Sequence, residues 1–309
     1  MKIFSGNSNL SLASKIAKHV GIPLGSVELK TFSDGELHVA FNENIRSEDV
    51  FLIQSTNPPS ENLMELLLML DAAKRASAKT VTAIIPYFGY SRQDRKDQPR
   101  VPISARVMLD LIAAVGVNRM ITMDLHSPQI QGFTNVPFDN LYSRIVLFSH
   151  LKSYGLDFST GVVLAPDVGS AQMSQAYAKK LGLSFALIDK RRPEHNVAEV
   201  VSLIGELKNK TVFIIDDMID TAGTICNAAR TAVENGANNV IAVATHPVLS
   251  GPAIDRLKEA PIEKVIVSDT IEMSKKQLFN KLEVVSVAEV FAESIIRINQ
   301  GGSISSLFK

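Results

Sequence analysis

The sequence predicts an α/β protein of two tandem domains, each a mainly parallel sheet flanked by helices, and three observations carry this prediction. Short apolar runs alternate with longer helical stretches, which is the order of βαβ units. The alternation occurs in both halves of the chain. The length of 309 residues also suffices for two ordinary domains. Two sheets in series are therefore favoured over one very wide sheet.

In the first half, strands and helices are expected in strict alternation. Each expected strand is a short apolar run, and each expected helix is a longer stretch that places apolar residues among polar ones. The expected order is strand 50–55, helix 61–76, strand 80–88, helix 102–116 and strand 119–126.

The second half repeats the pattern, which is why a second domain of similar design is expected. Its elements are strand 161–167, helix 170–182, strand 184–189, strand 209–218, helix 224–236, strand 239–248 and strand 264–270. The boundary is expected within 143–156, giving a first domain of 1–146 and a second of 147–287. The last segment, 288–309, is expected to pack back on the first domain.

Composition narrows the function classes. Hydrophobic residues make up 46% and charged residues 21%, which is typical of a globular protein. Lys+Arg and Asp+Glu number 32 each, so no net charge favours nucleic acid or an anionic membrane. The single Cys226 excludes an internal disulfide and suits a reducing compartment, and it is expected to be a core thiol rather than a nucleophile. Apolar clusters are too short to span a bilayer, so a cytoplasmic location is expected.

The run VFIIDDMIDTAGT, Val212 to Thr224, joins an apolar strand, two carboxylates and a loop of small residues that opens a helix. Small residues let backbone N–H groups approach an anion, and a helix N-terminus carries roughly +0.5 charge. The loop is therefore predicted to bind phosphate without a lysine. Asp216 and Asp217 would then face the 2- and 3-hydroxyls of a ribose whose 5-phosphate lies in the loop. An ordinary strand, turn and helix start is the alternative.

A dense charged loop, YSRQDRKD, follows the strand expected at 80–88 and contains Arg92, Arg95 and Lys96. Arginine offers a planar fork to phosphate oxygens and stacks on aromatic rings, so this loop is predicted to bind a nucleotide. The alternative is a solvated surface loop.

His126 and Asp167 each follow an apolar strand, where open α/β sheets present ligands. Asp167 precedes a glycine turn and suits Mg²⁺, which takes few protein oxygens and keeps water and phosphate ligands. A structural histidine and an N-cap aspartate are the alternatives.

Three successive cations, Lys190, Arg191 and Arg192, follow the strand expected at 184–189. Because like charges repel, a core is not expected to hold them together. The sequence therefore predicts a mobile exposed loop of the kind that closes over phosphates and neutralises charge during transfer.

Motifs along nearly the whole chain resemble one family, the ribose-phosphate pyrophosphokinases, also called phosphoribosyl-diphosphate synthetases. The resemblance implies two tandem type I phosphoribosyltransferase-like domains. The matching segments are FSDGE (32–36), YSRQDRKD (90–97), PISAR (102–106), MDLHSPQIQGF (123–133), DKRRP (189–193), the run at 212–224 and THPVLSGPAI (245–254).

The resemblance also implies a role for particular residues. The ATP-binding set is Phe32, Asp34, Glu36, Arg92, Gln93, Asp94 and His126. Of these, the FSDGE residues would come from a neighbouring subunit. The catalytic cations would be Lys190 and Arg192, and the cofactor Mg²⁺ would be bound with His126 and Asp167. The ribose 5-phosphate set is Asp216, Asp217, Asp220, Thr221, Ala222, Gly223 and Thr224.

The implied reaction transfers the β,γ-diphosphoryl group of MgATP to the 1-hydroxyl of ribose 5-phosphate and releases AMP. ATP and ribose 5-phosphate would be the partners, with a homohexamer as the assembly and inorganic phosphate and ADP as effectors. The chain has no Gly-Lys pair and no G-x-G-x-x-G, which excludes P-loop and Rossmann dinucleotide motifs.

One segment departs from the family pattern. Family members commonly read P-D-x-G-G-x-x-R where this chain reads PDVGSAQM, so Ser170 replaces a glycine and Met173 replaces an arginine. This departure opens the alternative of a catalytically weak regulatory paralogue. A phosphoribosyltransferase that consumes the activated sugar is a further alternative, but it leaves the ATP loop unexplained.

Overall fold

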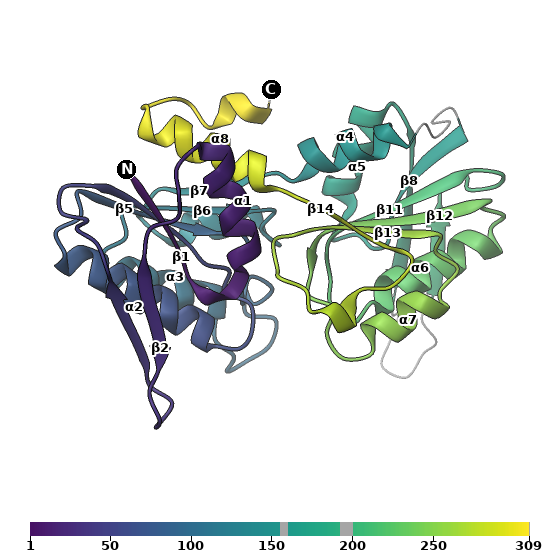
Figure 1. Cartoon of the computed structure of the whole chain (residues 1–309). Helices are drawn as coiled ribbons and strands as arrows, with labels where there is room; N and C mark the ends of the chain where they lie inside the picture. Colours follow the sequence, from purple (N-terminus) through teal and green to yellow (C-terminus); the bar gives the residue numbers. More distant parts are fainter. Residues whose placement is uncertain (155–159, 192–199, 309) are drawn as a thin grey trace. The chain divides into compact units, whose positions relative to one another are not determined.

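A computed structural model describes residues 1–154, 160–191 and 200–308, which form two compact units (Figure 1). The first unit comprises Met1–Ser143, Thr270–Glu272 and Ser286–Lys309, and the second comprises Arg144–Asp269 and Met273–Val285. Each unit has a mainly parallel sheet with helices on it, so the predicted α/β class is confirmed.

The first unit is built on a five-stranded parallel sheet in the order β1-β4-β5-β6-β7. Its strands are β1 (Lys2–Ser5), β4 (Asp49–Ile53), β5 (Thr80–Ile85), β6 (Arg119–Met123) and β7 (Phe138–Leu141). The helices are α1 (Leu10–Val20), α2 (Glu61–Arg75), α3 (Ser104–Ala114) and α8 (Ala288–Asn299), with 3₁₀ turns η1 (Asn7–Asn9), η2 (Pro128–Phe133) and η5 (Ser305–Phe308). Although α8 comes from the end of the chain, it packs against α1 (Figure 1).

A two-stranded antiparallel hairpin, β2 (Val27–Thr31) and β3 (Leu37–Phe41), stands apart from this sheet. It projects from the first unit, and its tip carries the FSDGE turn (Figure 1). The sequence analysis did not identify this hairpin as strands, because VELKT and LHVAF lack the continuous apolar runs by which the sheet strands were recognised.

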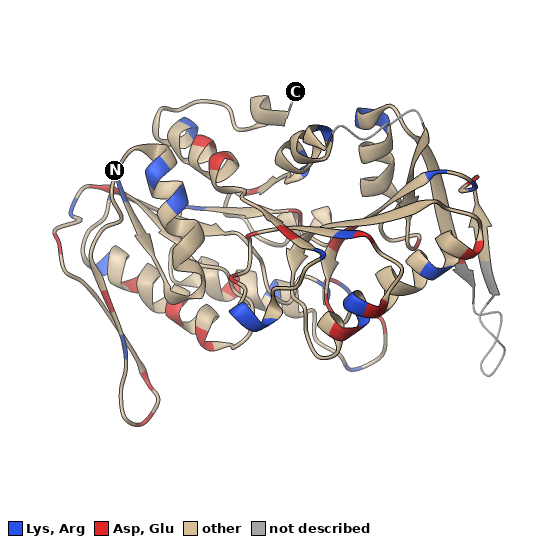
Figure 2. Cartoon of the chain, turned by 45° about the vertical axis from the view of Figure 1, so that its right-hand side comes forward, with Lys and Arg blue, Asp and Glu red and all other residues tan. Residues whose placement is uncertain are grey.

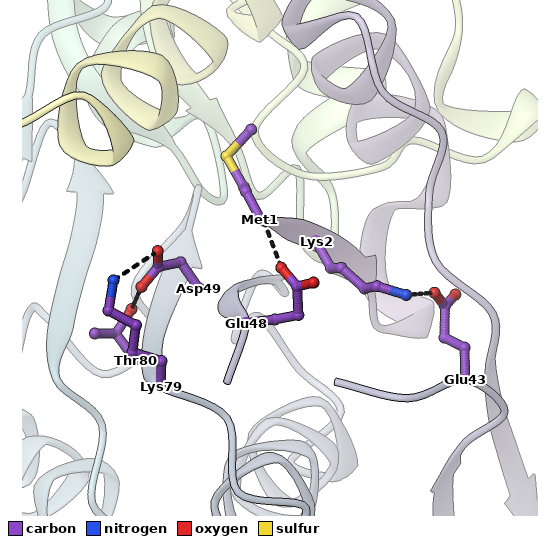
Figure 3. Close-up of polar contacts among 7 residues, drawn as sticks. All are labelled: Met1, Lys2, Glu43, Glu48, Asp49, Lys79 and Thr80. Carbon is purple, nitrogen blue, oxygen red and sulfur yellow. Dashed lines mark hydrogen bonds and ion pairs between the residues drawn. The ribbon is translucent and has the colours of Figure 1, made fainter. Parts of the chain in front are cut away.

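Ion pairs tie the amino ends of the strands in the first unit (Figure 3). The N-terminal amine lies 2.6 Å from Glu48 Oε2, and Lys2 pairs with Glu43. Thr80 Oγ1 donates to Asp49 Oδ1 at 2.7 Å, which lowers the pKa of Asp49. Ligands are expected at the opposite, carboxyl edge, because open α/β sheets bind them outside the carboxyl ends of their strands.

A buried carboxylate of α2 joins the residues that follow β1 to those that follow β4. Glu65 of α2 is 5% exposed. Its oxygens accept from Asn7 N at 2.6 Å, from Asn7 Nδ2 at 2.6 Å and from Gln54 Nε2 at 2.8 Å. The first unit therefore depends on one acidic side chain to satisfy three donors.

Glu65→Ala is expected to lower the free energy of unfolding of the first unit by about 1–3 kcal/mol, because one buried and two part-buried hydrogen bonds to a carboxylate are lost. Denaturant unfolding, monitored by hydrogen exchange of the backbone amides of α1 and α2, measures this loss. Glu61→Ala, which removes an exposed carboxylate from the same helix, is the control. Equal losses in the two variants would show that the network carries no special stability.

The second unit has a seven-stranded sheet in the order β10-β9-β8-β11-β12-β13-β14, parallel except for the antiparallel pair β9–β10. The strands are β8 (Gly161–Ala165), β9 (Ser184–Arg191), β10 (Val200–Ile204), β11 (Thr211–Ile219), β12 (Asn239–Pro247), β13 (Lys264–Ser268) and β14 (Leu282–Val285). The helices are α4 (Arg144–Ser153), α5 (Ala171–Leu181), α6 (Gly223–Glu234) and α7 (Ala253–Glu259), with the 3₁₀ turn η4 (Lys275–Gln277).

One apolar cluster covers each face of this sheet. Because side chains on both faces are buried, the central strands are almost continuously hydrophobic. Val212 and Ile214 of β11 point into a cluster with α6 and α7, whereas Phe213 and Ile215 point into one with α4 and α5. Cys226 is fully buried in the first of these clusters. Burial raises the pKa of its thiol, which disfavours the nucleophilic thiolate, as expected from its position.

The sequence prediction of a loop directly after residue 189 is wrong. Strand β9 continues to Arg191, and its backbone pairs with β10, where Lys190 lies opposite Val201 and Arg191 opposite Val200. Backbone hydrogen bonds to a neighbouring strand extend β9 irrespective of side-chain charge, and the sequence analysis left the partner run VVSLI of β10 unassigned.

Figure 2 shows acidic and basic residues distributed over both units, with neither sign confined to one of them. None of the helices in the described ranges is long and apolar enough to cross a membrane.

Candidate functional site

The run at 212–224 forms the strand, loop and helix that the sequence predicts. Strand β11 ends at Ile219, and α6 begins at Gly223. Between them Ala222 has φ 62°, a left-handed conformation that turns the chain sharply into the helix. Thr221 and Thr224 are exposed beside this turn. The helix therefore presents its N-terminal N–H groups at the carboxyl edge of the sheet, where an anion is stabilised.

Three carboxylates gather next to this loop. Strands β8 and β11 are parallel neighbours, with Leu164 opposite Ile214, so Asp167 and the pair Asp216–Asp217 leave the same edge. Burial, then the negative charges of Asp217 and Asp167, raise the pKa of Asp216 well above its ordinary value. The backbone N–H of Asp217, 3.0 Å from Asp216 Oδ1, partly opposes this shift. One backbone hydrogen bond to Asp216 therefore offsets part of the repulsion among the three carboxylates.

Asp167 also shapes the start of α5. Its Oδ1 accepts from Ser170 N at 3.0 Å, and Ser170 Oγ donates to Asp167 O at 3.0 Å. The N-cap of α5 is Ser170, so Asp167 is not the N-cap aspartate of the alternative interpretation, although one of its oxygens stabilises the turn before the helix. The serine at position 170 is 7% exposed and stabilises the turn. Met173 packs against the apolar cluster under α4 and α5, so it brings no charge to this loop.

A second segment contacts the loop Asp220 to Thr224, which is predicted to bind phosphate and is called the phosphate loop below, and the sequence analysis assigned this segment no role. Leu249 N donates to Ile219 O at 2.9 Å, and Ser250 N donates to Asp220 O at 3.0 Å. The hydroxyl of Ser250 donates to the carboxylate of Asp220. Arg256 Nη1 donates to Thr221 O at 3.0 Å. These residues belong to or follow the matching segment THPVLSGPAI, which was the available signal.

In the first unit, the charged loop is anchored to its neighbours through Gly89 and Gln93. Gly89 N donates to Thr56 Oγ1 at 2.8 Å, and a Cβ at Gly89 would lie 2.2 Å from Thr56 O, so only glycine fits. Ser104 of α3 donates to Gln93 Oε1, and Ala105 N donates to Gln93 O at 3.2 Å. Gln93 therefore has a structural contact in addition to its predicted one.

Around this anchored loop the two other predicted residues, Arg92 and Asp94, differ in exposure. Arg92 is exposed and Asp94 is half-buried. An exposed guanidinium beside a rigid turn remains suited to a nucleotide phosphate.

His126 lies just beyond β6, as predicted, and is exposed. The turn that carries it is unusual, because Asp124 has φ 40° and is only 4% exposed. Asp124 Oδ2 accepts from Ser143 N at 3.0 Å, and Leu125 N donates to Asn140 Oδ1 at 3.0 Å. Backbone strain of this kind clusters at functional sites.

The FSDGE turn places Phe32, Asp34 and Glu36 at the hairpin tip. Asp34 Oδ1 accepts from Glu36 N at 3.0 Å, and Phe32 N donates to Glu36 O at 2.8 Å. Phe32 is 54% exposed, with its ring 5.5 Å from that of His38. An exposed aromatic ring on a projecting hairpin suits contact with another molecule.

The remaining predicted residues are described only in part. Lys190 lies one residue before the end of β9, and Arg192 lies outside the described residues. Within the described ranges no group of three or more His, Cys, Asp or Glu side chains is arranged to hold a metal ion by itself. His126 belongs to the first unit and Asp167 to the second, so their joint metal binding stays a prediction.

A parallel α/β sheet with a carboxylate pair and a small-residue loop at a helix N-terminus defines the phosphoribosyltransferase class of fold. Two family models narrow this class: the N-terminal domain of ribose phosphate pyrophosphokinase matches residues 1–116, and the phosphoribosyl synthetase-associated domain matches residues 195–309.

Full-length relatives agree with these models. A ribose-phosphate pyrophosphokinase of Chlorobaculum tepidum is 51% identical over 100% of this chain and 95% of its own. One of Aquifex aeolicus is 48% identical over 100% and 99%. The crystal structure of phosphoribosylpyrophosphate synthetase from Mycobacterium smegmatis has a TM-score of 0.92 at 38% identity, covering 97% of this chain and 99% of that one. The chain belongs to the ribose-phosphate pyrophosphokinase family.

Proposed function

We propose that this protein transfers the β,γ-diphosphoryl group of MgATP to the 1-hydroxyl of ribose 5-phosphate, giving 5-phosphoribosyl 1-diphosphate and AMP. The observation that carries the proposal is the carboxylate pair of β11 next to the small-residue loop of α6, in a chain that full-length ribose-phosphate pyrophosphokinases match. The first unit would serve ATP and the second ribose 5-phosphate.

The sugar would be held through both of its ends. The N–H groups of Thr221 to Thr224 and the α6 N-terminus bind the 5-phosphate, while Asp216 and Asp217 accept hydrogen bonds from the 2- and 3-hydroxyls. Asp220 acts indirectly, since its carboxylate accepts from Ser250 and so fixes the loop. Such positioning aligns the 1-hydroxyl with its target, which is the main source of rate in phosphoryl transfer.

The cofactor Mg²⁺ fits the chemistry of this edge. Asp167, Asp216 and Asp217 concentrate negative charge that a cation would relieve, and Mg²⁺ needs only one or two protein carboxylates when phosphates complete its shell. Asp167 and, from the first unit, His126 would hold the ion with ATP. Bound Mg²⁺ would supply charge neutralisation at the phosphates.

The nucleotide would be bound by the first unit. Arg92, Gln93 and Asp94 line one anchored loop, with Gln93 fixed by Ser104 of α3. Phe32, Asp34 and Glu36 would complete the adenine site of a neighbouring subunit, which the exposure of Phe32 at the hairpin tip supports. The assembly would then be a homohexamer located in the cytoplasm, with inorganic phosphate and ADP as effectors.

Lys190 and Arg192 would neutralise charge that grows on the transferred group and the leaving AMP oxygen. No protein group has to form a covalent intermediate, because phosphoryl-type transfer passes through a loose transition state that needs mainly electrostatic stabilisation.

Production of AMP by the purified protein with ATP, ribose 5-phosphate and Mg²⁺ tests the proposal, and the reaction without sugar is the control. Sugar-dependent AMP together with 5-phosphoribosyl 1-diphosphate is the expected result. Folded protein that binds ATP and yields no AMP would instead identify a regulatory paralogue. Met173 is the observation that favours this second function, since its half-buried side chain packs against an apolar cluster where the family pattern has a charge.

A further inference from the structure

Arg256 of α7 lies directly behind the phosphate loop, although it is far from that loop in the sequence. Its Nη1 donates to Thr221 O at 3.0 Å. The same nitrogen lies 3.6 Å from the position that a Cβ on Gly223 would occupy. The guanidinium therefore borders Thr221 of the loop and Gly223, the first residue of α6.

Among the described residues, no carboxylate pairs with the charge of Arg256, and the first turn of α6 contains no acidic residue. The loop from Asp220 to Thr224 contains no lysine or arginine. A guanidinium has five N–H donors in a rigid fork, and one hydrogen bond to Thr221 O leaves most of that capacity for an anion.

We propose that Arg256 is a positioning residue of the phosphate loop, which fixes the backbone at Thr221 and supplies the permanent positive charge that the loop lacks. This inference rests on the proposed function, since it takes the 5-phosphate of the sugar as the anion. The backbone N–H groups of Leu249 and Ser250 donate to the carbonyl oxygens of Ile219 and Asp220. These bonds hold the segment that leads into α7 against the phosphate loop, and α7 carries Arg256.

Arg256→Met should weaken binding of ribose 5-phosphate by about 10- to 100-fold, because hydrogen bonds to charged groups are among the strong ones. Calorimetric titration with ribose 5-phosphate measures this directly. Arg256→Lys keeps the charge and should recover part of the affinity. Lys258→Met removes an exposed cation from the same helix and should bind like wild type.

A second readout separates the charge from a merely structural role. The affinity for inorganic phosphate, measured as competition against ribose 5-phosphate, should fall in Arg256→Met, and the dependence of sugar affinity on salt should become shallower. The KM for ATP should stay within about twofold of wild type. Unchanged sugar affinity in Arg256→Met, or weakened sugar affinity with unchanged phosphate affinity and salt dependence, would overturn the role of Arg256.

Failure of the proposed function gives a different pattern. In one outcome, wild type binds ribose 5-phosphate, Arg256→Met does not, and wild type forms no AMP. This outcome would support the role of Arg256 and refute the proposed diphosphotransferase activity. A wild-type protein that binds neither the sugar phosphate nor inorganic phosphate overturns both. If Arg256→Met does not fold, Arg256→Lys and Lys258→Met are compared in the same titrations. Weaker sugar binding by Arg256→Lys alone would support the role of Arg256, and equal binding by the two variants would overturn it.

Discussion

Lys190→Ala is expected to lower kcat by about 10²- to 10³-fold, the loss typical when one donor to a developing charge is removed. Affinity for ribose 5-phosphate should remain within about twofold, because the lysine acts on the transition state and not on the bound sugar. Lys190 lies near the end of β9, opposite Val201, so the pairing of β9 with β10 should keep the backbone in place when the side chain is removed.

Quench-flow measurement of AMP, combined with calorimetric titration of the sugar, tests this expectation. Lys180→Ala, which removes an exposed lysine at the end of α5, is the matched control and should leave both quantities unchanged. If Lys190→Ala loses sugar binding and turnover to the same extent, the residue binds the ground state and its catalytic role is refuted.

Asp216→Asn is expected to stabilise the ligand-free protein near neutral pH while weakening its affinity for the sugar. Burial and the charges of Asp217 and Asp167 raise the pKa of Asp216 in the folded state. Folding therefore gains from protonated Asp216 at low pH, and this gain is lost as the pH rises through the raised pKa. An asparagine has no charge to bury, so the variant escapes that loss.

Thermal unfolding over a pH series checks the sign of the effect. The Tm of Asp216→Asn should exceed that of wild type above the raised pKa and converge with it below the ordinary range of aspartate, with each ~1 kcal/mol of relieved repulsion worth roughly 2–4 °C in a domain of about this size. Added Mg²⁺ should raise the Tm of wild type more than that of the variant.

Glu263→Gln neutralises an exposed carboxylate of the same unit and serves as the control. A Tm difference between Asp216→Asn and wild type that does not change with pH would contradict the electrostatic account. A higher Tm together with weaker sugar binding would show that the carboxylate cluster is maintained for ligands at a cost in stability.

Some parts of the candidate site were predictable because they are contiguous. The strand, acid pair and loop of 212–224 lie within one short run, and both the apolar strand and the small loop residues are visible in it. The position of His126 at a strand end was predictable for the same reason. The antiparallel extension of β9 was not predicted, because the run VVSLI of β10 favours a strand but does not indicate which strand it pairs with.

The α/β class and the strand, loop and helix start of 212–224 were determined by the sequence itself, since apolar periodicity and loop composition act over a few residues. Only the tertiary structure decided that Asp167 shifts the pKa of Asp216 and that Arg256 contacts Thr221, 35 positions earlier. Parallel strands bring distant segments to one edge through crossover connections, and burial then changes their electrostatics. Neither neighbour identity nor desolvation is encoded in a local pattern, so both appear only when the chain is folded.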